Sequence, residues 1–260
     1  MNIDDKIVKK YLAGDPLDEI KNHWIFDNLE EGKHLFEPPS IDKQGEIEKI
    51  LSSVHNSLSD FNPLNRGIYS AIYPEWAETI KEMNVLLIVG CPNPYDAMVK
   101  EHHDKQYIVF DLLRLNDYVE MGYRVDLIIK QLITHETSHL CLHKKYPVPT
   151  SKDYKIRLKH MVFDEGFAHL LAFHEDIEHY NFTELIEEHY MKSWLKLSAA
   201  LEETNPDKQK ELLIQADSGS YWDKFASVSG KLFLAMNRKD LVDLYHKGID
   251  NFIEQMELRS

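Results

Sequence analysis

Two histidines and a glutamate lie close together in the segment His135-Glu136-Thr137-Ser138-His139. Residues four apart on a helix project from the same face, so both imidazoles can bind one Zn²⁺ ion. Glu136, next to the first histidine, can then act as the general base for a water molecule on that metal. The spacing therefore predicts a helix that supplies His135 and His139 as metal ligands and Glu136 as a catalytic base.

A catalytic zinc site needs a third protein ligand and one position that is open to water. A histidine six residues after His139 would give the metzincin pattern, but Lys145 stands there, and Leu142 replaces the glycine of that pattern. Glu165 lies 26 residues after His139, beyond a loop that contains two prolines, so a later helix can return to the metal. We therefore expect Glu165 to be the third ligand and the chain to be a metallopeptidase with one Zn²⁺.

The combination of His135-Glu136-x-x-His139 with Glu165-Gly166-x-Ala168 resembles the gluzincin peptidases, the clan of thermolysin-like and aminopeptidase-like enzymes. It is particularly similar to small bacterial families whose second helix opens with Glu-Gly-x-Ala. The resemblance covers residues 84–235 and implies a zincin-like catalytic core with an edge strand, 107–111, that lines the substrate cleft. It also implies that Gly166 and Ala168 are small because two helices approach closely at the metal.

The same resemblance implies a downstream Tyr or His that stabilises the oxyanion of the reaction. Tyr221 is the first candidate because it opens a helix after a glycine break, and a plain packing role is the alternative. Tyr190 and His246 are weaker candidates. An aminopeptidase needs acidic groups that hold the substrate amine, and these commonly come from a Gly-rich segment before the motif. No Gly-x-Met-x-Asn-like segment precedes His135, which favours an endo- or oligopeptidase over an aminopeptidase.

Three further residues near the motif have more than one interpretation. His143 lies one turn after His139, and a solvated or capping histidine is the favoured interpretation over a ligand. His169 stands one turn after Glu165, where thermolysin-like enzymes have a carboxylate that supports a ligand histidine, and it departs from that pattern. Asp164 either supplies the missing carboxylate or caps the helix that follows it, and the sequence leaves both open.

The elements that must position these residues are mostly helical. Apolar runs at 85–90 and 107–111 predict two strands, with a short helical stretch from Pro94 between them. A long helix is expected over about residues 122–143, a helix that starts at Asp164, and helices around 183–203, 207–217, 221–237 and 240–257. Helical signals dominate residues 1–60. The order predicts an α+β fold with a small mixed sheet, a helical flank over 1–83 and a zincin-like domain with a helical C-terminal part over 84–260.

Composition limits the function further. The formal charge of −14, without blocks of basic residues, argues against nucleic-acid binding. Two cysteines cannot form a disulfide framework, and no apolar run approaches 18 residues, so we expect a cytoplasmic protein without a membrane anchor. The expected partner is a peptide or protein substrate, and the oligomeric state stays open. The alternative function is a zinc-binding regulatory or single-partner protein, whose fourth metal position would hold a protein ligand.

Overall fold

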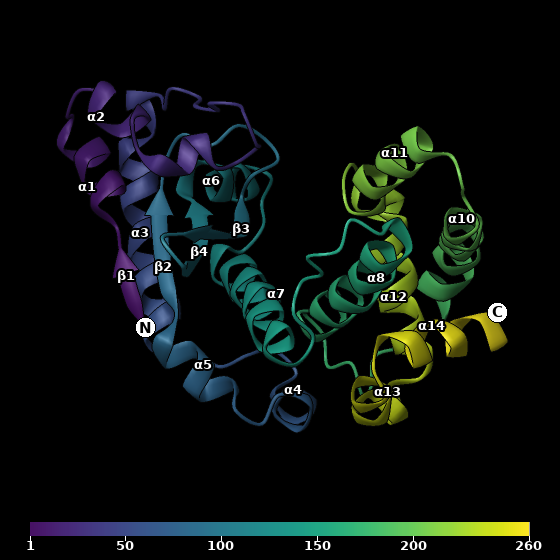
Figure 1. Cartoon of the computed structure of the whole chain (residues 1–260). Coiled ribbons are helices and arrows are strands. Elements are labelled where there is room, and N and C mark those ends of the chain that lie inside the picture. The colour runs from purple at the N-terminus through teal and green to yellow at the C-terminus, as the bar shows by residue number, and fades with distance from the viewer. Residues whose placement is uncertain (260) are drawn as a thin grey trace. The chain divides into compact units, whose positions relative to one another are not determined.

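The computed structural model describes residues 1–259, and it is predominantly helical with a single four-stranded sheet in that range (Figure 1). The expected α+β class is therefore confirmed. The chain forms two compact units. The first comprises Met1–Asn62 and Ala77–Glu136, and the second comprises Pro63–Trp76 and Thr137–Ser260. The division falls inside one helix, α7, which spans Val125–Lys145. Within residues 1–259, no helix combines the length and the apolar character needed to cross a membrane.

The sheet of the first unit has the order β1-β2-β4-β3. Its strands are β1 (Asn2–Asp4), β2 (Asn84–Ile88), β3 (Ala97–His102) and β4 (Lys105–Asp111). β1, β2 and β4 are parallel, and β3 runs antiparallel to β4. The strands expected at 85–90 and 107–111 are thus confirmed, and the buried apolar run of β2 suits a strand covered on both faces.

Two expectations for this sheet are wrong. The segment after Pro94 forms strand β3 rather than a helix, because His103 and Asp104 both adopt positive φ and close a two-residue hairpin into β4. Since β4 pairs with β2 on one side and β3 on the other, residues 107–111 form an interior strand and not an edge strand.

Helices complete the first unit. They are α1 (Lys6–Ala13), α2 (Asp18–Lys21), α3 (Gln44–Ser59), most of α5 (Trp76–Glu82) and α6 (Leu112–Glu120), with 3₁₀ turns η1 (Trp24–Asp27) and η2 (Ile41–Lys43). The apolar stripe of α3 is buried and packs on α1 and α6. Asp111, the last residue of β4, accepts hydrogen bonds from the amides of Leu113 and Arg114 and so caps α6.

In its described residues, the second unit contains helices and loops. Its helices are α4 (Arg66–Ile72), the C-terminal half of α7, α8 (Tyr154–Leu171), α9 (Thr183–Leu185), the π-helix η3 (Ile186–Tyr190), α10 (Met191–Leu201), α11 (Pro206–Ala216), η4 (Tyr221–Asp223), α12 (Phe225–Met236), η5 (Arg238–Asp240), α13 (Leu241–Lys247) and α14 (Ile249–Leu258). The helices expected downstream of residue 183 are present. The last one is split because Gly248 adopts a φ of +86°.

Helices α8 and α12 cross at a pair of glycines. A Cβ atom at Gly166 would lie 2.9 Å from Cα of Gly230, and one at Gly230 would lie 2.2 Å from the main-chain oxygen of Val162. Side chains at either position would therefore collide with main-chain atoms. We expected Gly166 to be small because α8 approaches the histidine-bearing helix, α7. This expectation is wrong, because the main chain that lies close to Gly166 belongs to α12.

Candidate metal centre

The histidine motif lies in the middle of α7, with His135 and His139 one helical turn apart. Ile129 and Ile133 are fully buried and hold this helix by one apolar face. Around the motif the helix is also held by polar contacts, since the hydroxyl of the buried Tyr69 donates to Thr137 Oγ1 over 3.1 Å. The motif is thus placed on a helix rather than a loop.

Helix α8 carries Asp164 and Glu165 in its interior. Its N-cap is Asp153, whose side chain accepts a hydrogen bond from the amide of Ile156. The helix begins ten residues before Asp164, so the cap interpretation of Asp164 is wrong, and Glu165 does not lie in a first turn. The remaining interpretation of Asp164 is a carboxylate that supports a histidine.

The Asp164 carboxylate lies between two imidazoles of α7. Its Oδ1 is 2.7 Å from His139 Nδ1, and its Oδ2 is 2.7 Å from His143 Nε2. Burial opposes ionisation, but the two histidines outweigh it and hold the pKa of Asp164 well below its usual range. His143 is therefore mostly buried and hydrogen-bonded, which corrects the expectation of a solvated or capping residue. Its Nδ1 has no hydrogen-bond partner among residues 1–259.

Glu165 faces histidines through both of its oxygens. Oε1 lies 3.6 Å from Nε2 of His139, and Oε2 lies 3.5 Å from Nε2 of His169. Zinc bonds to nitrogen and oxygen are about 2.0–2.2 Å long, so two ligands of a tetrahedral ion are separated by about 3.3–3.6 Å. The distance between His139 Nε2 and Glu165 Oε1 matches that separation.

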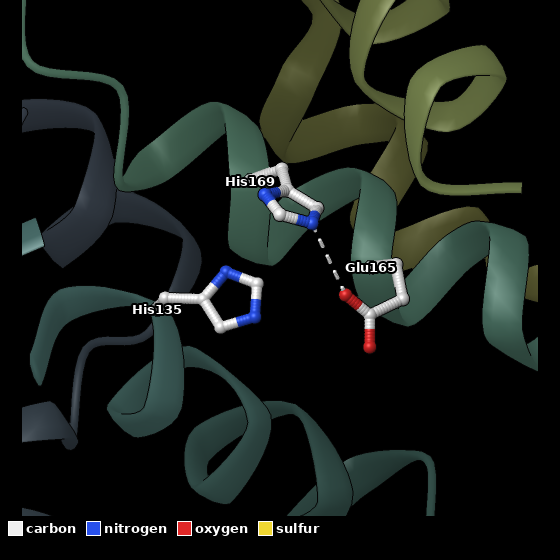
Figure 2. Close-up of side chains that lie close together, drawn as sticks. All are labelled: His135, Glu165 and His169. Atoms are coloured by element: carbon white, nitrogen blue, oxygen red, sulfur yellow. Dashed lines mark ion pairs between the residues drawn. The ribbon is translucent and has the colours of Figure 1, made fainter. Parts of the chain in front are cut away.

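His135 belongs to the first unit, whereas Glu165 and His169 belong to the second. Figure 2 draws these three residues, with His135 on α7, Glu165 and His169 on α8, and a dashed line for the ion pair between the last two. Glu136, the expected base, is buried with 6% of its surface exposed. His169, which departs from the gluzincin pattern, thus lies beside the expected third ligand.

One group, His139 with His143 and Asp164, gathers three possible metal ligands. Its two nitrogen–oxygen distances of 2.7 Å are hydrogen-bond lengths and are shorter than the ligand separations around zinc. This group fits a hydrogen-bonded support for His139. Two imidazoles and a carboxylate, with a further carboxylate behind one imidazole, form a donor set that fits Zn²⁺.

Tyr221 begins η4, next to α8. Its ring meets that of His169 edge to face, with 5.3 Å between the centroids. Burial, with the charge of Glu165, raises the pKa of Tyr221 above its usual value, so the phenol stays neutral and remains a hydrogen-bond donor. Tyr190 and His246, the weaker candidates for stabilising the oxyanion, lie in other surroundings. Tyr190 is part of the hydrophobic core, and the exposed His246 on α13 contacts Lys145.

Lys231 was not singled out from the sequence. It lies on α12 with only 5% of its surface exposed, and its Nζ donates a hydrogen bond to Tyr221 Oη over 2.7 Å. A usable signal was present, because Lys231 is the only charged residue in the segment Phe225–Met236. A helix that is apolar on all sides is buried, so a single charge within it marks an unusual environment.

The structure thus brings Glu165 of the predicted ligands next to His139 and His169, and it places Tyr221 beside His169. His139 is in turn supported by Asp164. No family model, no curated protein and no solved structure matches the chain.

Proposed function

We propose that the chain is a zinc-dependent peptidase of the gluzincin type, with His135, His139 and Glu165 as the metal ligands. The observation that carries the proposal is the two-sided environment of His139. Its Nδ1 faces Asp164 at hydrogen-bond distance, and its Nε2 faces Glu165 at the separation of two zinc ligands. An imidazole that donates one N–H to a carboxylate presents the other nitrogen as a lone pair, which is the form that binds a metal.

The chain's own residues then have defined roles. Glu136, next to the ligand His135, accepts a proton from the attacking water and transfers it to the nitrogen of the leaving amine. Tyr221 donates a hydrogen bond to the carbonyl oxygen as that oxygen gains negative charge. Zn²⁺, when bound, acts as a Lewis acid that lowers the pKa of water and polarises the carbonyl. The substrate is a peptide or protein, and internal peptide bonds are the favoured target.

A second candidate function rests on His169. If this residue bound the metal as a fourth protein ligand, no position would be left for water, and the site would be structural. The chain would then be a zinc-binding regulatory or single-partner protein. Against this, His169 Nε2 faces Oε2 of Glu165, whereas His139 faces Oε1, so the two histidines contact different carboxylate oxygens. This arrangement favours His169 as a residue that orients Glu165.

The test is the cleavage of a diverse peptide library, read by mass spectrometry, with zinc content measured on the same samples. We expect the wild-type chain to bind one zinc and to cut peptides. Glu136→Gln should bind the same amount of zinc and lose at least about 10²-fold in rate, because the base is removed without a change of ligands. Glu178→Gln is the matched control, because it makes the same exchange at an exposed glutamate, and it should cut as the wild type does.

Wild-type protein that binds one zinc but cuts no peptide would contradict the peptidase proposal and favour the binding protein. Equal cleavage by wild type and Glu136→Gln would point to a contaminating protease. Protein that binds no zinc would reject both candidates.

A further inference from the structure

Lys231 is a buried lysine whose surroundings are aromatic. Its Nζ lies 4.6 Å from the ring centroid of Phe173, 5.0 Å from that of Tyr221 and 6.0 Å from that of Trp222. No carboxylate among the described residues forms an ion pair with it. Burial without a negative partner disfavours the ammonium form, and it lowers the pKa of Lys231 to about 8. A group that costs stability in this way, in a cluster beside a candidate metal centre, is a candidate for a functional role.

The hydrogen bond between Lys231 and Tyr221 has a fixed direction. An ammonium group carries three donors and no acceptor, so Nζ must donate and the phenolic oxygen must accept over the 2.7 Å between them. A phenol has a single hydrogen, and it cannot point at Lys231. The proton of Tyr221 is therefore available to an acceptor elsewhere.

The position of Tyr221 indicates where that acceptor lies. Its ring packs edge to face on His169, and the charge of Glu165 acts on its hydroxyl. Glu165 and Lys231 are also the direct sequence neighbours of Gly166 and Gly230, the pair at which α8 and α12 cross. The lysine, the tyrosine and the expected metal ligand are thus held together by one close helix contact.

We infer that Lys231 is a positioning residue, which holds the hydroxyl of Tyr221 as an acceptor so that its proton is donated to the carbonyl oxygen of a bound peptide. This role rests on the proposed peptidase function and deepens it. The positive charge next to the phenol also strengthens Tyr221 as a donor at the moment when the carbonyl oxygen becomes negative. No covalent bond to Lys231 or Tyr221 is involved.

The test is a double-mutant cycle on the zinc-loaded full chain, with a peptide that the wild type cuts. The variants are Tyr221→Phe, Lys231→Met and their combination, and kcat and KM are measured for each. Tyr221→Phe should lower kcat by about 10²-fold with little change in KM, since the hydrogen bond forms in the transition state. Lys231→Met should lower kcat by at least about 10-fold in the wild-type background. It should have no further effect in the Tyr221→Phe background, because it acts through the hydroxyl.

Lys196→Met is the matched control, because Lys196 also lies over an aromatic ring, that of Phe225, but does not contact Tyr221. It should leave kcat unchanged. Should Lys231→Met fail to fold, Lys231→Gln replaces it, because this variant keeps an N–H donor without the charge and should lose an intermediate part of kcat.

Each outcome decides the role of Lys231. Equal losses of kcat from Lys231→Met in both backgrounds would show a structural effect and overturn the inference, while the peptidase proposal would stand. An unchanged kcat in Lys231→Met would overturn it as well. A wild-type chain that cuts no peptide would reject the peptidase proposal, and the role of Lys231 would fall with it.

Discussion

Oδ1 of Asp164 lies 2.7 Å from Nδ1 of His139, and the next residue of α8, Glu165, lies 3.6 Å from the other nitrogen of the same ring. Two consecutive carboxylates thus contact opposite edges of one imidazole. In the proposed zinc site, the first carboxylate fixes the orientation and tautomer of the ring, and the second is a ligand on the side of the ring that faces the metal. In the thermolysin-like pattern the supporting carboxylate follows the ligand glutamate by four residues, whereas Asp164 immediately precedes Glu165, the proposed ligand.

Asp164→Asn should weaken zinc binding by about 10- to 100-fold, because the carboxylate that supports His139 loses its charge. The affinity is measured by competition with a chromogenic chelator. Asp153→Asn serves as the control, since it alters the N-cap of the same helix without touching a histidine. Equal zinc affinity of Asp164→Asn and the wild type would remove the support role.

His169→Ala distinguishes an orienting residue from a fourth ligand. If His169 only orients Glu165, the variant should still bind one zinc, with an affinity reduced by about 10- to 100-fold. His139→Ala, which removes a ligand, should lose far more. Isothermal titration of the metal-free variants with Zn²⁺ gives both values. A loss in His169→Ala as large as that in His139→Ala would show a four-ligand site and support the binding-protein alternative.

Lys231→Met should raise the free energy of unfolding at pH 7. Burial lowers the pKa of Lys231 from 10.5 to about 8, so the unfolded chain binds a proton between these pH values that the folded chain lacks. The free energy of unfolding therefore rises with pH between 8 and 10.5. Below pH 8 the buried ammonium lowers it by its full amount, roughly 3 kcal/mol at most.

The advantage of Lys231→Met over the wild type should accordingly shrink as the pH rises from 8 towards 10.5. Urea unfolding at several pH values measures this difference, with the exposed Lys196→Met as the control. A difference that does not vary with pH would show that the folded-state pKa of Lys231 is not lowered.

Asp111→Ala should destabilise the first unit without affecting zinc binding. The carboxylate of Asp111 accepts hydrogen bonds from the amides of Cys91, Leu113 and Arg114, at 2.6, 2.9 and 3.2 Å, and it is fully buried. Their loss should cost about 2–4 kcal/mol in the free energy of unfolding. Urea denaturation measures the loss, and Asp117→Ala, a partly exposed neighbour on α6, should cost much less. Equal effects of the two substitutions would contradict the role of Asp111.

The sequence predicted the helices and two strands well where the pattern was local. The apolar run of β2 and the helical period of α3 were sufficient, because each residue's environment follows from its own neighbours. Strand β3 was missed because its hairpin depends on positive φ at His103 and Asp104, residue types that are not strong turn formers at both positions. Its pairing also decides that β4 is interior, which only the sheet order reveals.

The sequence singled out the proposed ligands, whose role stays a prediction, but it did not reveal the residues that surround them. Fixed spacing along α7 places His135 and His139 on one face, and a later helix brings Glu165 to His139. The start of α8 was misplaced because Asp164 resembles an N-cap, while the true cap, Asp153, lies 11 residues earlier, directly after the proline-containing loop. The contacts of Asp164 with His143 and of Lys231 with Tyr221 join residues 21 and 10 positions apart on different elements, so no local pattern encodes them.

The crossing of α8 and α12 has a genetic consequence. A larger residue at Gly230 would meet the main-chain oxygen of Val162, and one at Gly166 would meet the main chain of Gly230. Main-chain atoms are common to every residue type, so no substitution in the facing helix can make room. A screen for second-site suppressors of Gly230→Ala should therefore recover reversion to glycine, and no compensating exchange at position 166 or 162.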